Sequence, residues 1–513
     1  MEHISSIISM LPRDYQKNIF ETAREKNTLV VLPTGLGKTL IALMLAVERK
    51  TKHPADKIVF LAPTRPLAEQ HFEYFKKHLS ELFAELALFT GEVPAEKRHH
   101  IWQTAEIIFS TPQCIANDLK NYLYNLSDVS LLIIDEAHRC IKNYDYTKVV
   151  GLYKKQSANQ RILGLTASPG HDSDKVKQIA KHLELDEIEV RTRDSPDVKP
   201  YLQEREYDKV EVSFPPELME IRSLLKKIWD DKVEKLKHRN LLFGPANKIT
   251  LLNLQNRLTA QISSRNFNAM VGMSLTAQAI KISHAIELLE TQTLSGLDIY
   301  MNSMIEQAKQ KKSKAVQTIV KSPEFSTARI LLQQLLAKKV EHPKISKILE
   351  ITEGQFKENP NSKIIIFSQF RETAQSISQK INEISGIKSS IFIGQAKKLG
   401  AGLSQKEQRQ IIEDFREGKL NVICATSIGE EGLDIPEVSA VIFYEPIPSA
   451  IRKIQRAGRT ARLMPGKLII LVTKDTRDEI HHYASSARER KMYKVIENVK
   501  NEMKNHPRTL SDF

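Results

Sequence analysis

The segment TLVVLPTGLGKT, residues 28–39, determines how the chain is organised. Its apolar start, residues 28–32, predicts a buried strand, and residues 40–49 predict the helix that follows. Between them, glycines let backbone N–H groups approach phosphates, and the helix N-terminus adds positive potential. The predicted phosphate loop consists of Pro33, Thr34, Gly35, Leu36, Gly37, Lys38 and Thr39.

Lys38 and Thr39 carry the chemistry of this loop. Lys38 would reach the β- and γ-phosphates of a nucleotide, and the Thr39 hydroxyl would join the shell of a Mg²⁺ ion. Leu32 stands where the general pattern has its first glycine, so the loop is a variant form. The competing interpretation is a plain strand-to-helix turn that contains glycine.

The apolar runs on both sides of a helical middle segment follow one rhythm. Short continuous runs separated by helical stretches are typical of a parallel sheet covered on both faces. From residue 217 to about residue 340, apolar residues recur only at helical spacing. The runs are residues 28–32, 58–61, 107–109, 131–134 and 162–165, then 363–367, 390–393, 422–424, 441–443 and 468–472.

This rhythm predicts an α/β fold with two parallel-sheet regions and an inserted all-helical domain. We expect a first domain over residues 1–205 and a helical insert over residues 206–344. A second domain would cover residues 345–490, followed by a terminal helix and tail at 491–513. The length of 513 residues agrees with about three domains.

The composition is that of folded globular domains, with 41% hydrophobic and 27% charged residues. The three cysteines lie far apart, which argues against a disulfide scaffold and a Cys-rich zinc site. No apolar run reaches about 18 residues, the length that predicts a membrane span. The N-terminus lacks the basic start of a secretory signal. We therefore expect an intracellular, reduced and soluble protein without a membrane partner.

A second candidate catalytic segment, DEAH, occupies residues 135–138. It follows the apolar run 131–134, and side chains at the carboxyl end of a parallel strand face the ligand crevice. Asp135 is placed to hold Mg²⁺, and Glu136 is placed to act as general base on an attacking water. Taken alone, the segment could also be a charged surface turn.

The second βα region contains an arginine-rich segment, QRAGRTAR, at residues 455–462. On a helix, Arg456, Arg459 and Arg462 would lie close to one face. Their mutual repulsion would be relieved by an anion, and they suit a γ-phosphate approached from a neighbouring domain. A solvated basic helix is the competing interpretation.

Together these segments resemble the motifs of superfamily 2 helicases and translocases, most closely those of the archaeal Hef / FANCM group. The resemblance covers about residues 8–495, and the motifs stand in the family's order. It implies two tandem RecA-like domains with ATP and Mg²⁺ in the cleft between them. Closure of that cleft would drive stepwise movement on a strand.

On the nucleotide side, the resemblance assigns roles residue by residue. Arg13 and Gln16 lie in a segment similar to the motif that reads adenine, and Gly432 and Asp434 would contact the nucleotide. The residues that would face the γ-phosphate are Gln455, Arg459 and Arg462. The residues that would couple the ATP state to the nucleic acid are His138, Thr166 and Ser168.

On the nucleic-acid side, four segments resemble the family's strand-contacting motifs: residues 62–67, 110–113, 367–371 and 425–435. The contacts implied there are Thr64, Arg65, Thr111, Gln113, Ser368, Gln369 and Thr426.

The helical insert holds most of the chain's positive charge. Residues 221–344 contain 20 Lys+Arg and 9 Asp+Glu, which is +11 of the chain's +14. The densest run includes Lys311 and Lys312, which we predict as nucleic-acid contacts, although a run of lysines can be plain solvated surface. The five aromatic residues of the insert do not alternate with these lysines, so we expect most of them in the core rather than in a base-stacking platform.

The resemblance implies an ATP-dependent DNA helicase or translocase that acts on forked and branched DNA, including stalled replication forks and Holliday-type junctions. A double-stranded RNA-dependent ATPase of the RIG-I/Dicer type is the alternative, because that type also has a helical insert. A nucleic-acid scaffold with a vestigial ATP site is a third hypothesis, which the intact motif residues disfavour.

The family also suggests a sliding clamp or a separate nuclease as protein partners. The chain stops at Phe513, and Val495 replaces the closing aspartate of a nuclease-like signature, so we expect no nuclease activity. The expected location is cytoplasmic and associated with the nucleoid of an archaeal-type cell.

Overall fold

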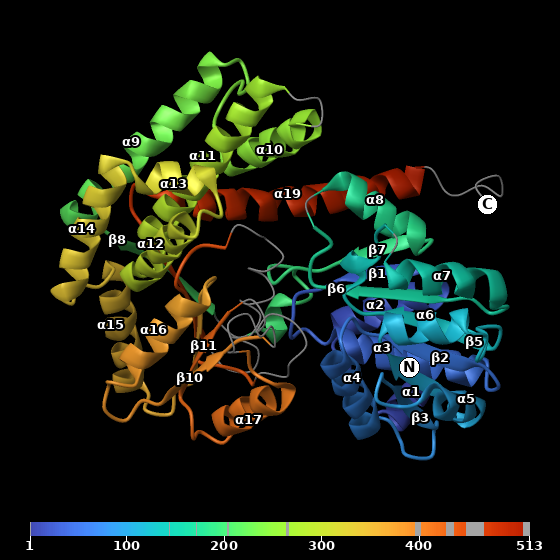
Figure 1. The fold of residues 1–513 in the computed structure, drawn as a ribbon. Helices are drawn as coiled ribbons and strands as arrows, with labels where there is room; N and C mark the ends of the chain where they lie inside the picture. The colour runs from blue at the N-terminus through green and yellow to red at the C-terminus, as the bar shows by residue number, and fades with distance from the viewer. Residues whose placement is uncertain are drawn as a thin grey trace.

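The structure is a computed structural model. It describes residues 2–142, 144–170, 172–202, 205–262, 266–394, 402–426, 436–447 and 466–505. Two α/β domains lie side by side, and a helical domain projects from the second of them (Figure 1). The predicted fold class, two parallel sheets with an all-helical domain inserted between them, is confirmed.

The first sheet has seven parallel strands in the order β3-β4-β2-β5-β6-β1-β7. Strands β1, β2, β4, β5 and β6 are buried along their whole length, because helices cover both faces. The bounds are β1 Thr28–Val31, β2 Lys57–Leu61, β3 Leu86–Phe89, β4 Ile107–Ser110, β5 Val129–Ile134, β6 Ile162–Thr166 and β7 Glu187–Val190.

Two apolar cores lie on the two faces of this sheet. The first three longer helices, with the short α1 (Glu2–Ile7), cover one face: α2 (Asp14–Glu25), α3 (Lys38–Lys52) and α4 (Arg65–His78). The other face is covered by α5 (Ala95–Thr104), α6 (Pro112–Lys120), α7 (Asp145–Gln156) and α8 (Ser173–His182).

The second sheet is also parallel, in the order β10-β11-β9-β12-β13-β8. Its strands are β8 Arg205–Val212, β9 Ile364–Phe367, β10 Ser389–Phe392, β11 Val422–Ala425, β12 Ala440–Phe443 and β13 Gly466–Thr473, with helices α15 Pro343–Glu358, α16 Arg371–Ile381 and α17 Gln405–Arg416. All eight residues of β8 pair with β13, so the strand belongs to the second sheet, although residues 206–212 of it fall in the range 206–344 that we assigned to the insert. Its alternating charged residues gave no apolar run to predict it.

The inserted domain consists of six described helices around two apolar clusters. The larger cluster joins α9, α11, α12, α13 and α14, and the smaller one joins the end of α9 to α10 and the start of α11. The bounds are α9 Pro216–His238, α10 Lys248–Ile262, α11 Phe267–Thr291, α12 Leu294–Lys309, α13 Lys314–Val320 and α14 Pro323–Ala337.

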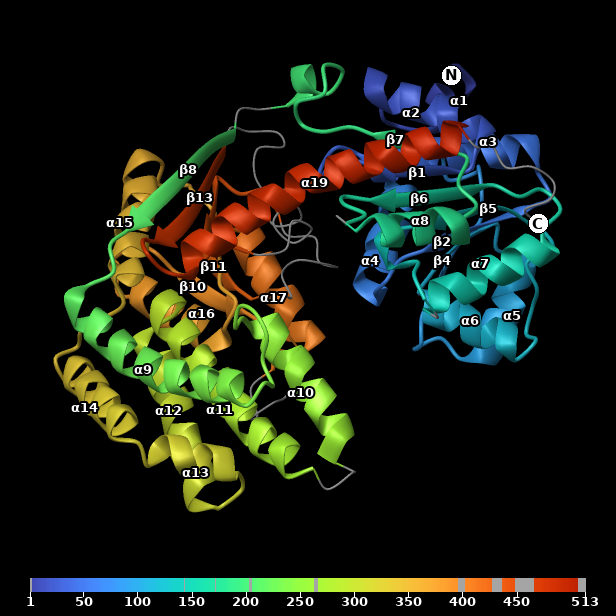
Figure 2. The ribbon, with the colours of Figure 1, turned by 90° about the horizontal axis from the view of Figure 1, so that it is seen from above.

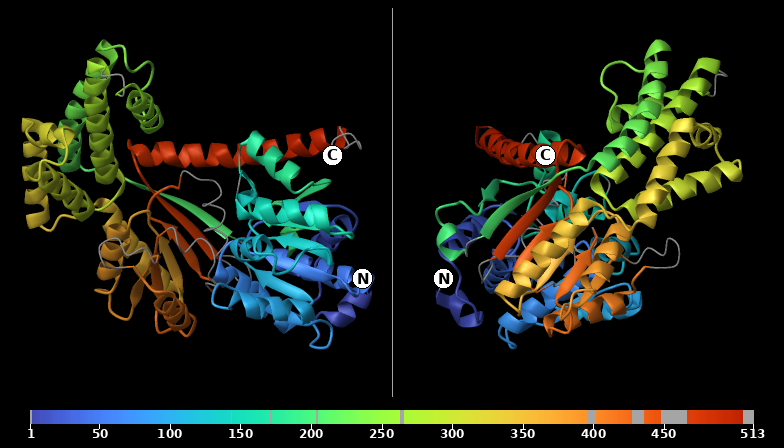
Figure 3. Two further views of the ribbon diagram at one scale, coloured as in Figure 1. Left: turned by 45° about the vertical axis from the view of Figure 1, so that its right-hand side comes forward. Right: turned by 90° about the vertical axis from the view of Figure 1, so that its left-hand side faces the viewer.

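A long helix, α19 (Arg477–Asn505), crosses from the second domain to the first (Figure 2). Its 29 residues span about 43 Å at 1.5 Å per residue. Near its start, Arg477 donates hydrogen bonds to Ser283 of α11, and the Asp478 carboxylate pairs with Lys344 of α15 inside the protein. Its second half runs along the first domain beside α8, as the left view of Figure 3 also shows. The two α/β domains are therefore joined by a helix as well as by the insert.

Candidate functional site

The phosphate loop joins the end of β1 to the start of α3. Gly35 and Gly37 have φ values of 87° and 78°, in the left-handed region that favours glycine. A Cβ atom at Gly37 would also lie 2.2 Å from Gln16 Nε2, so only glycine fits there. Lys38 folds back over the loop, and its Nζ donates to the Leu32 carbonyl at 2.8 Å.

Residues from α2 hold the loop at one carbonyl. Gln16 Nε2 and the Tyr15 hydroxyl both donate to the Leu36 carbonyl, at 3.1 and 2.8 Å. Gln16 Oε1 accepts from the Arg13 backbone N–H at 2.8 Å, so Gln16 links the start of α2 to the phosphate loop. Arg13 itself stacks over the Tyr201 ring, 5.3 Å from its centroid. Sequence analysis did not single out Tyr15, whose fully buried ring looks like an ordinary core residue in sequence.

Asp135 follows β5 directly and is almost completely buried. Its Oδ2 lies 3.0 Å from His71 Nε2, and His71 Nδ1 lies 3.4 Å from Thr39 Oγ1. Burial raises the pKa of Asp135, but the hydrogen bond from His71 and the electrostatic effects of His71 and Lys38 outweigh it, so the pKa lies below its ordinary value. Thr39 and Asp135, the two predicted Mg²⁺ ligands, therefore face one imidazole.

These two residues fit a magnesium ion. Hydroxyl and carboxylate oxygens are the donors that Mg²⁺ prefers, and it is usually bound by one or two protein groups together with substrate phosphates and water. Within the described residues there is no cluster of three or more His, Cys, Asp or Glu residues that could hold a metal ion. The assignment of Mg²⁺ to Thr39 and Asp135 stays a prediction.

The predicted coupling residues form a second set of contacts beside the first. His138 Nδ1 lies 3.1 Å from Glu136 Oε2 and 3.2 Å from Thr166 Oγ1. The Thr166 hydroxyl oxygen in turn accepts from the Ser168 backbone N–H at 3.1 Å. Thr166 ends β6, the strand that pairs with both β5 and β1, so neighbouring strands bring these side chains together.

The contacts continue from Ser168 to α19. The Ser168 hydroxyl lies 2.7 Å from the Met492 sulfur. On α19, Met492 and three further apolar residues, Val495, Ile496 and Val499, are buried in the same core as Val176 and Ile179 of α8. Two ion pairs border this contact, Lys177–Glu502 and Lys500–Glu187. Sequence analysis expected a charged terminal helix and did not predict that it packs on the first domain.

The residues of the first domain that we predicted to contact a nucleic-acid strand lie where neighbouring β-strands end. Thr64 and Thr111 are the N-cap residues of α4 and α6, which follow the neighbouring strands β2 and β4. Gln113 Nε2 donates to the Tyr144 hydroxyl at 3.4 Å. Arg65 pairs with Glu69 at 2.6 Å and also with Glu92.

Glu69 also reaches across to the second domain. Its Oε2 lies 2.5 Å from Nη2 of Arg409 on α17. Ser368 and Gln369 follow β9, and Thr426 follows the neighbouring strand β11, so these predicted contacts also gather at carboxyl ends of strands. Ser368 and Thr426 are buried, and the Gln369 backbone N–H donates to the Glu445 carboxylate.

Six predicted site residues lie outside the described residues: Gly432, Asp434, Gln455, Arg456, Arg459 and Arg462. Their roles stay predictions from the sequence.

Most aromatic residues of the insert lie in its core, as predicted. Trp229, Tyr300 and Phe325 pack there, whereas Phe243 and Phe267 are 70% and 74% exposed. Phe243 lies in the connection between α9 and α10, and Phe267 begins α11. Lys311 and Lys312, between α12 and α13, are exposed.

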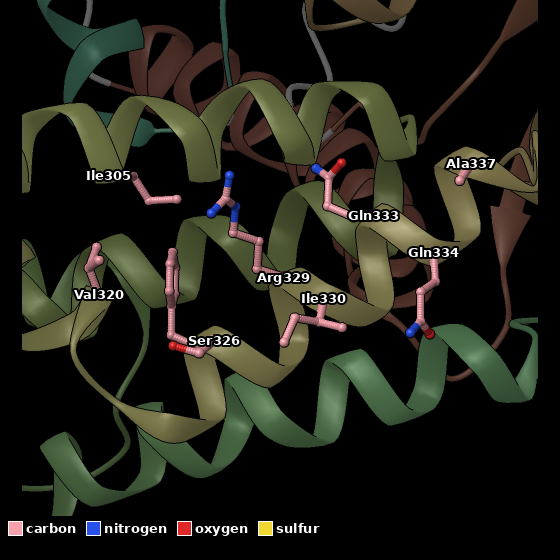
Figure 4. Close-up of a pocket in the computed structure, with 9 residues that line it drawn as sticks. Ile305, Val320, Ser326, Arg329, Ile330, Gln333, Gln334 and Ala337 are labelled. Atoms are coloured by element: carbon pink, nitrogen blue, oxygen red, sulfur yellow. The ribbon is translucent and has the colours of Figure 1, made fainter.

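A cavity of about 650 Å³ also lies in the insert, among α12, α13 and α14 (Figure 4). Five of its nine lining residues are apolar, and the polar members are Ser326, Arg329, Gln333 and Gln334. Arg329 Nη2 donates to Asn302 of α12 at 3.2 Å. No motif residue lines this cavity, so it is separate from the candidate nucleotide site.

Three family models match successive parts of the chain. They are DEAD/DEAH box helicase over residues 13–176, an ATP-dependent RNA helicase helical bundle over residues 217–341, and the helicase conserved C-terminal domain over residues 343–464. The crystal structure of the Pyrococcus furiosus Hef helicase domain is 42% identical in sequence and has a TM-score of 0.73. The match covers 92% of this chain and 98% of that one.

The chain belongs to the Hef / FANCM family of helicases. The resemblance inferred from the motifs is thus confirmed. Similar members of the family include a putative ATP-dependent RNA helicase of Methanocaldococcus jannaschii, 36% identical over 95% of this chain. Others are the DNA helicase mph1 of Neurospora crassa, 35% identical over 91%, and the Fanconi anemia group M protein homolog of Mus musculus, 32% identical over 94%.

The chain spans 61%, 41% and 26% of the length of these three relatives. In the described residues, no helix has both the length and the apolar character needed to cross a membrane.

Proposed function

We propose that this chain is an ATP-dependent DNA helicase or translocase that acts on forked and branched DNA in repair and recombination. The observation that carries the proposal is the pair of contact sets at the ends of β1, β5 and β6. One joins Thr39, His71 and Asp135, and the other joins Glu136, His138 and Thr166. In a Hef / FANCM family chain, this arrangement supports hydrolysis coupled to a nucleic-acid track.

The nucleotide chemistry follows from these positions. Lys38 would bind the β- and γ-phosphates, and Thr39 and Asp135 would hold Mg²⁺, which neutralises phosphate charge when bound. Glu136 accepts the proton of the attacking water. Its Oε2 lies 3.1 Å from His138 Nδ1, which also lies 3.2 Å from the Thr166 hydroxyl.

The second domain completes the site. Gln455, Arg459 and Arg462 would reach the γ-phosphate when the two domains close, and Gly432 and Asp434 would contact the nucleotide. Closure would also strain α19, because the two ends of this helix are held by different domains. Arg477 and Asp478 contact the insert and α15 of the second domain, whereas Met492 is buried in the core of the first domain. A motor whose domains alternate between open and closed states would pull on α19 in each cycle.

The nucleic-acid track combines the strand-end contacts with the insert. Thr64, Thr111, Ser368 and Thr426 follow strands of the two sheets, and in parallel sheets this is the side on which ligands bind. In the insert, residues 235–286 contain seven Lys or Arg and no Asp or Glu; we call this stretch the basic lobe. Such a surface favours the phosphate backbone of a nucleic acid whatever its base sequence, and the exposed Phe243 and Phe267 add apolar area to it.

ATP turnover with different nucleic acids tests the proposal. Hydrolysis is measured with single-stranded, duplex, forked and four-way DNA and with duplex RNA, all at one stated salt concentration. We expect the forked and four-way DNA to stimulate most. Equal stimulation by every DNA would remove the branch preference, and stronger stimulation by duplex RNA would favour the RNA-dependent alternative.

A Glu136→Gln variant separates a motor from a scaffold. The amide cannot accept the proton of water, so turnover should fall by about 10²- to 10⁴-fold, while forked DNA is still bound. The matched control is Glu73→Gln, at an exposed position of α4, which should turn over normally. Unchanged turnover in Glu136→Gln would contradict the assigned chemistry.

A function on DNA would place the chain at the nucleoid. A sliding clamp and a separate nuclease are proposed as partners on the family resemblance alone.

A further inference from the structure

His71 occupies an unusual position on α4. The buried side of this helix consists of Ala68, His71 and Phe75, so a titratable residue stands where an apolar one would be expected. His71 is only 7% exposed, and its ring packs against Phe60 with centroids 4.4 Å apart. Sequence analysis assigned it no role.

Both ring nitrogens of His71 face predicted magnesium ligands. An ionised carboxylate can only accept hydrogen bonds, so Nε2 is the donor to Asp135 Oδ2 at 3.0 Å. In a neutral imidazole, Nδ1 is then the acceptor, and it faces the Thr39 hydroxyl at 3.4 Å. Burying a polar ring is costly without partners, and these two residues supply both of them.

This arrangement suits a metal site in a specific way. A threonine hydroxyl that offers a lone pair to a cation must direct its proton elsewhere, and His71 Nδ1 is the acceptor within reach. A carboxylate with one oxygen held by Nε2 keeps a fixed orientation for its second oxygen. Outer partners of this kind orient metal ligands, and their loss typically weakens metal binding by about 10- to 100-fold.

We propose that His71 is a positioning residue that holds the Thr39 hydroxyl and the Asp135 carboxylate in place for the nucleotide-bound magnesium ion. The inference rests on the nucleotide site of the proposed function and not on DNA. His71 touches no phosphate in this scheme. Because His71 already holds these two side chains in place, they need to move less when the metal ion binds.

Metal binding measured without hydrolysis tests the proposal. The full chain is titrated with Mn²⁺ in the presence of saturating ADP, and free Mn²⁺ is followed by electron paramagnetic resonance. His71→Leu, which removes both hydrogen bonds, should bind Mn²⁺ about 10- to 100-fold more weakly. Its affinity for ADP without metal should stay within about twofold of the unmodified chain.

Two amide variants distinguish the loss of the hydrogen bond to Asp135 from a simple loss of packing. In His71→Gln the amide nitrogen can reach Asp135 as Nε2 does, so Mn²⁺ binding should return to within a few-fold. In His71→Asn the shorter side chain cannot reach, and binding should stay weak. The control is His78→Leu, on the same helix, whose ring contacts Ser9 instead of a metal ligand.

The outcomes are distinct. Mn²⁺ binding by His71→Leu that equals that of His78→Leu would overturn the proposal. So would equal Mn²⁺ binding by His71→Gln and His71→Asn, a comparison that remains decisive if His71→Leu does not fold. Loss of ADP binding without metal would instead indicate a structural role. Failure of DNA-stimulated turnover would overturn the proposed function and leave this result untouched.

Discussion

The candidate nucleotide site and the basic lobe would bind phosphate in opposite ways. At the nucleotide site, Thr39 and Asp135 both contact His71, and His71 and Asp135 are buried, so each position depends on the others. On the basic lobe, seven Lys or Arg residues are spread over about 50 residues that contain no Asp or Glu, and two of them pair with Asp231 and Glu287 at its borders. A buried network concentrates its effect in few residues, whereas an exposed charged surface distributes it over many.

The sharpest test of this contrast uses two ion pairs. Lys344 and Asp478 are both fully buried where α15 meets the start of α19, whereas Lys309 and Glu306 are both exposed on α12. Asp478→Ala leaves a buried lysine without its partner and should cost about 3–5 kcal/mol of unfolding free energy. Glu306→Ala should cost less than about 1 kcal/mol. Urea unfolding followed by circular dichroism checks both, and similar losses would break the comparison.

A single change at the nucleotide site should nearly abolish turnover. Lys38→Ala removes the cation that would stabilise the β- and γ-phosphates, and the loss of one such group costs about 10²- to 10³-fold in rate. Steady-state hydrolysis with forked DNA measures it. Lys17→Ala, on the exposed face of α2, is the matched control and should keep full turnover. Normal turnover in Lys38→Ala would contradict the site assignment.

A moderate effect is expected from the exposed aromatic residues of the insert. If bases exposed at a fork stack on Phe243 and Phe267, alanine at either position should cost about 1–3 kcal/mol of binding free energy for forked DNA. Plain duplex DNA, whose bases are already stacked, should be bound almost unchanged. Tyr122→Ala, an aromatic residue 92% exposed on the first domain, is the control. Equal losses for forked and duplex DNA would exclude stacking.

The smallest effect should come from two lysines of the exposed run, changed together. Lys311→Ala combined with Lys312→Ala should lower affinity uniformly for all DNA shapes. The slope of log affinity against log salt should fall by about 0.9 for each lost phosphate contact with duplex DNA. Lys76→Ala with Lys77→Ala, at the opposite end of α4 from Thr64, is the control pair. An unchanged slope would indicate that Lys311 and Lys312 are plain solvated surface.

Three strands escaped prediction, for one physical reason. β3, β7 and β8 lie at sheet edges, where a strand is only partly buried and its sequence alternates or is charged. Central strands such as β5 are buried on both faces and reveal themselves as continuous apolar runs. The apolar runs therefore predicted all the central strands but, of the four edge strands, only β10.

In the candidate site, too, some residues could be predicted from the sequence and others could not. Pro33–Thr39 and residues 135–138 could be predicted because backbone geometry ties those residue types to short sequence intervals. His71 could not, since it lies 32 residues from Thr39 and 64 from Asp135 in sequence. The only local signal was a histidine at an apolar position of α4.

The sequence by itself determined the two βα regions, the helical insert, the phosphate loop, the acidic segment at 135–138 and the location of the positive charge. These features follow from periodicity and composition, which can be read from residues that are close together in the sequence. Only the tertiary structure decided that His71 joins the two predicted metal ligands, that Tyr15 supports the loop at Leu36, and that α19 packs on the first domain through Met492. Such contacts join residues far apart in the chain, and they arise from how whole helices and sheets pack together.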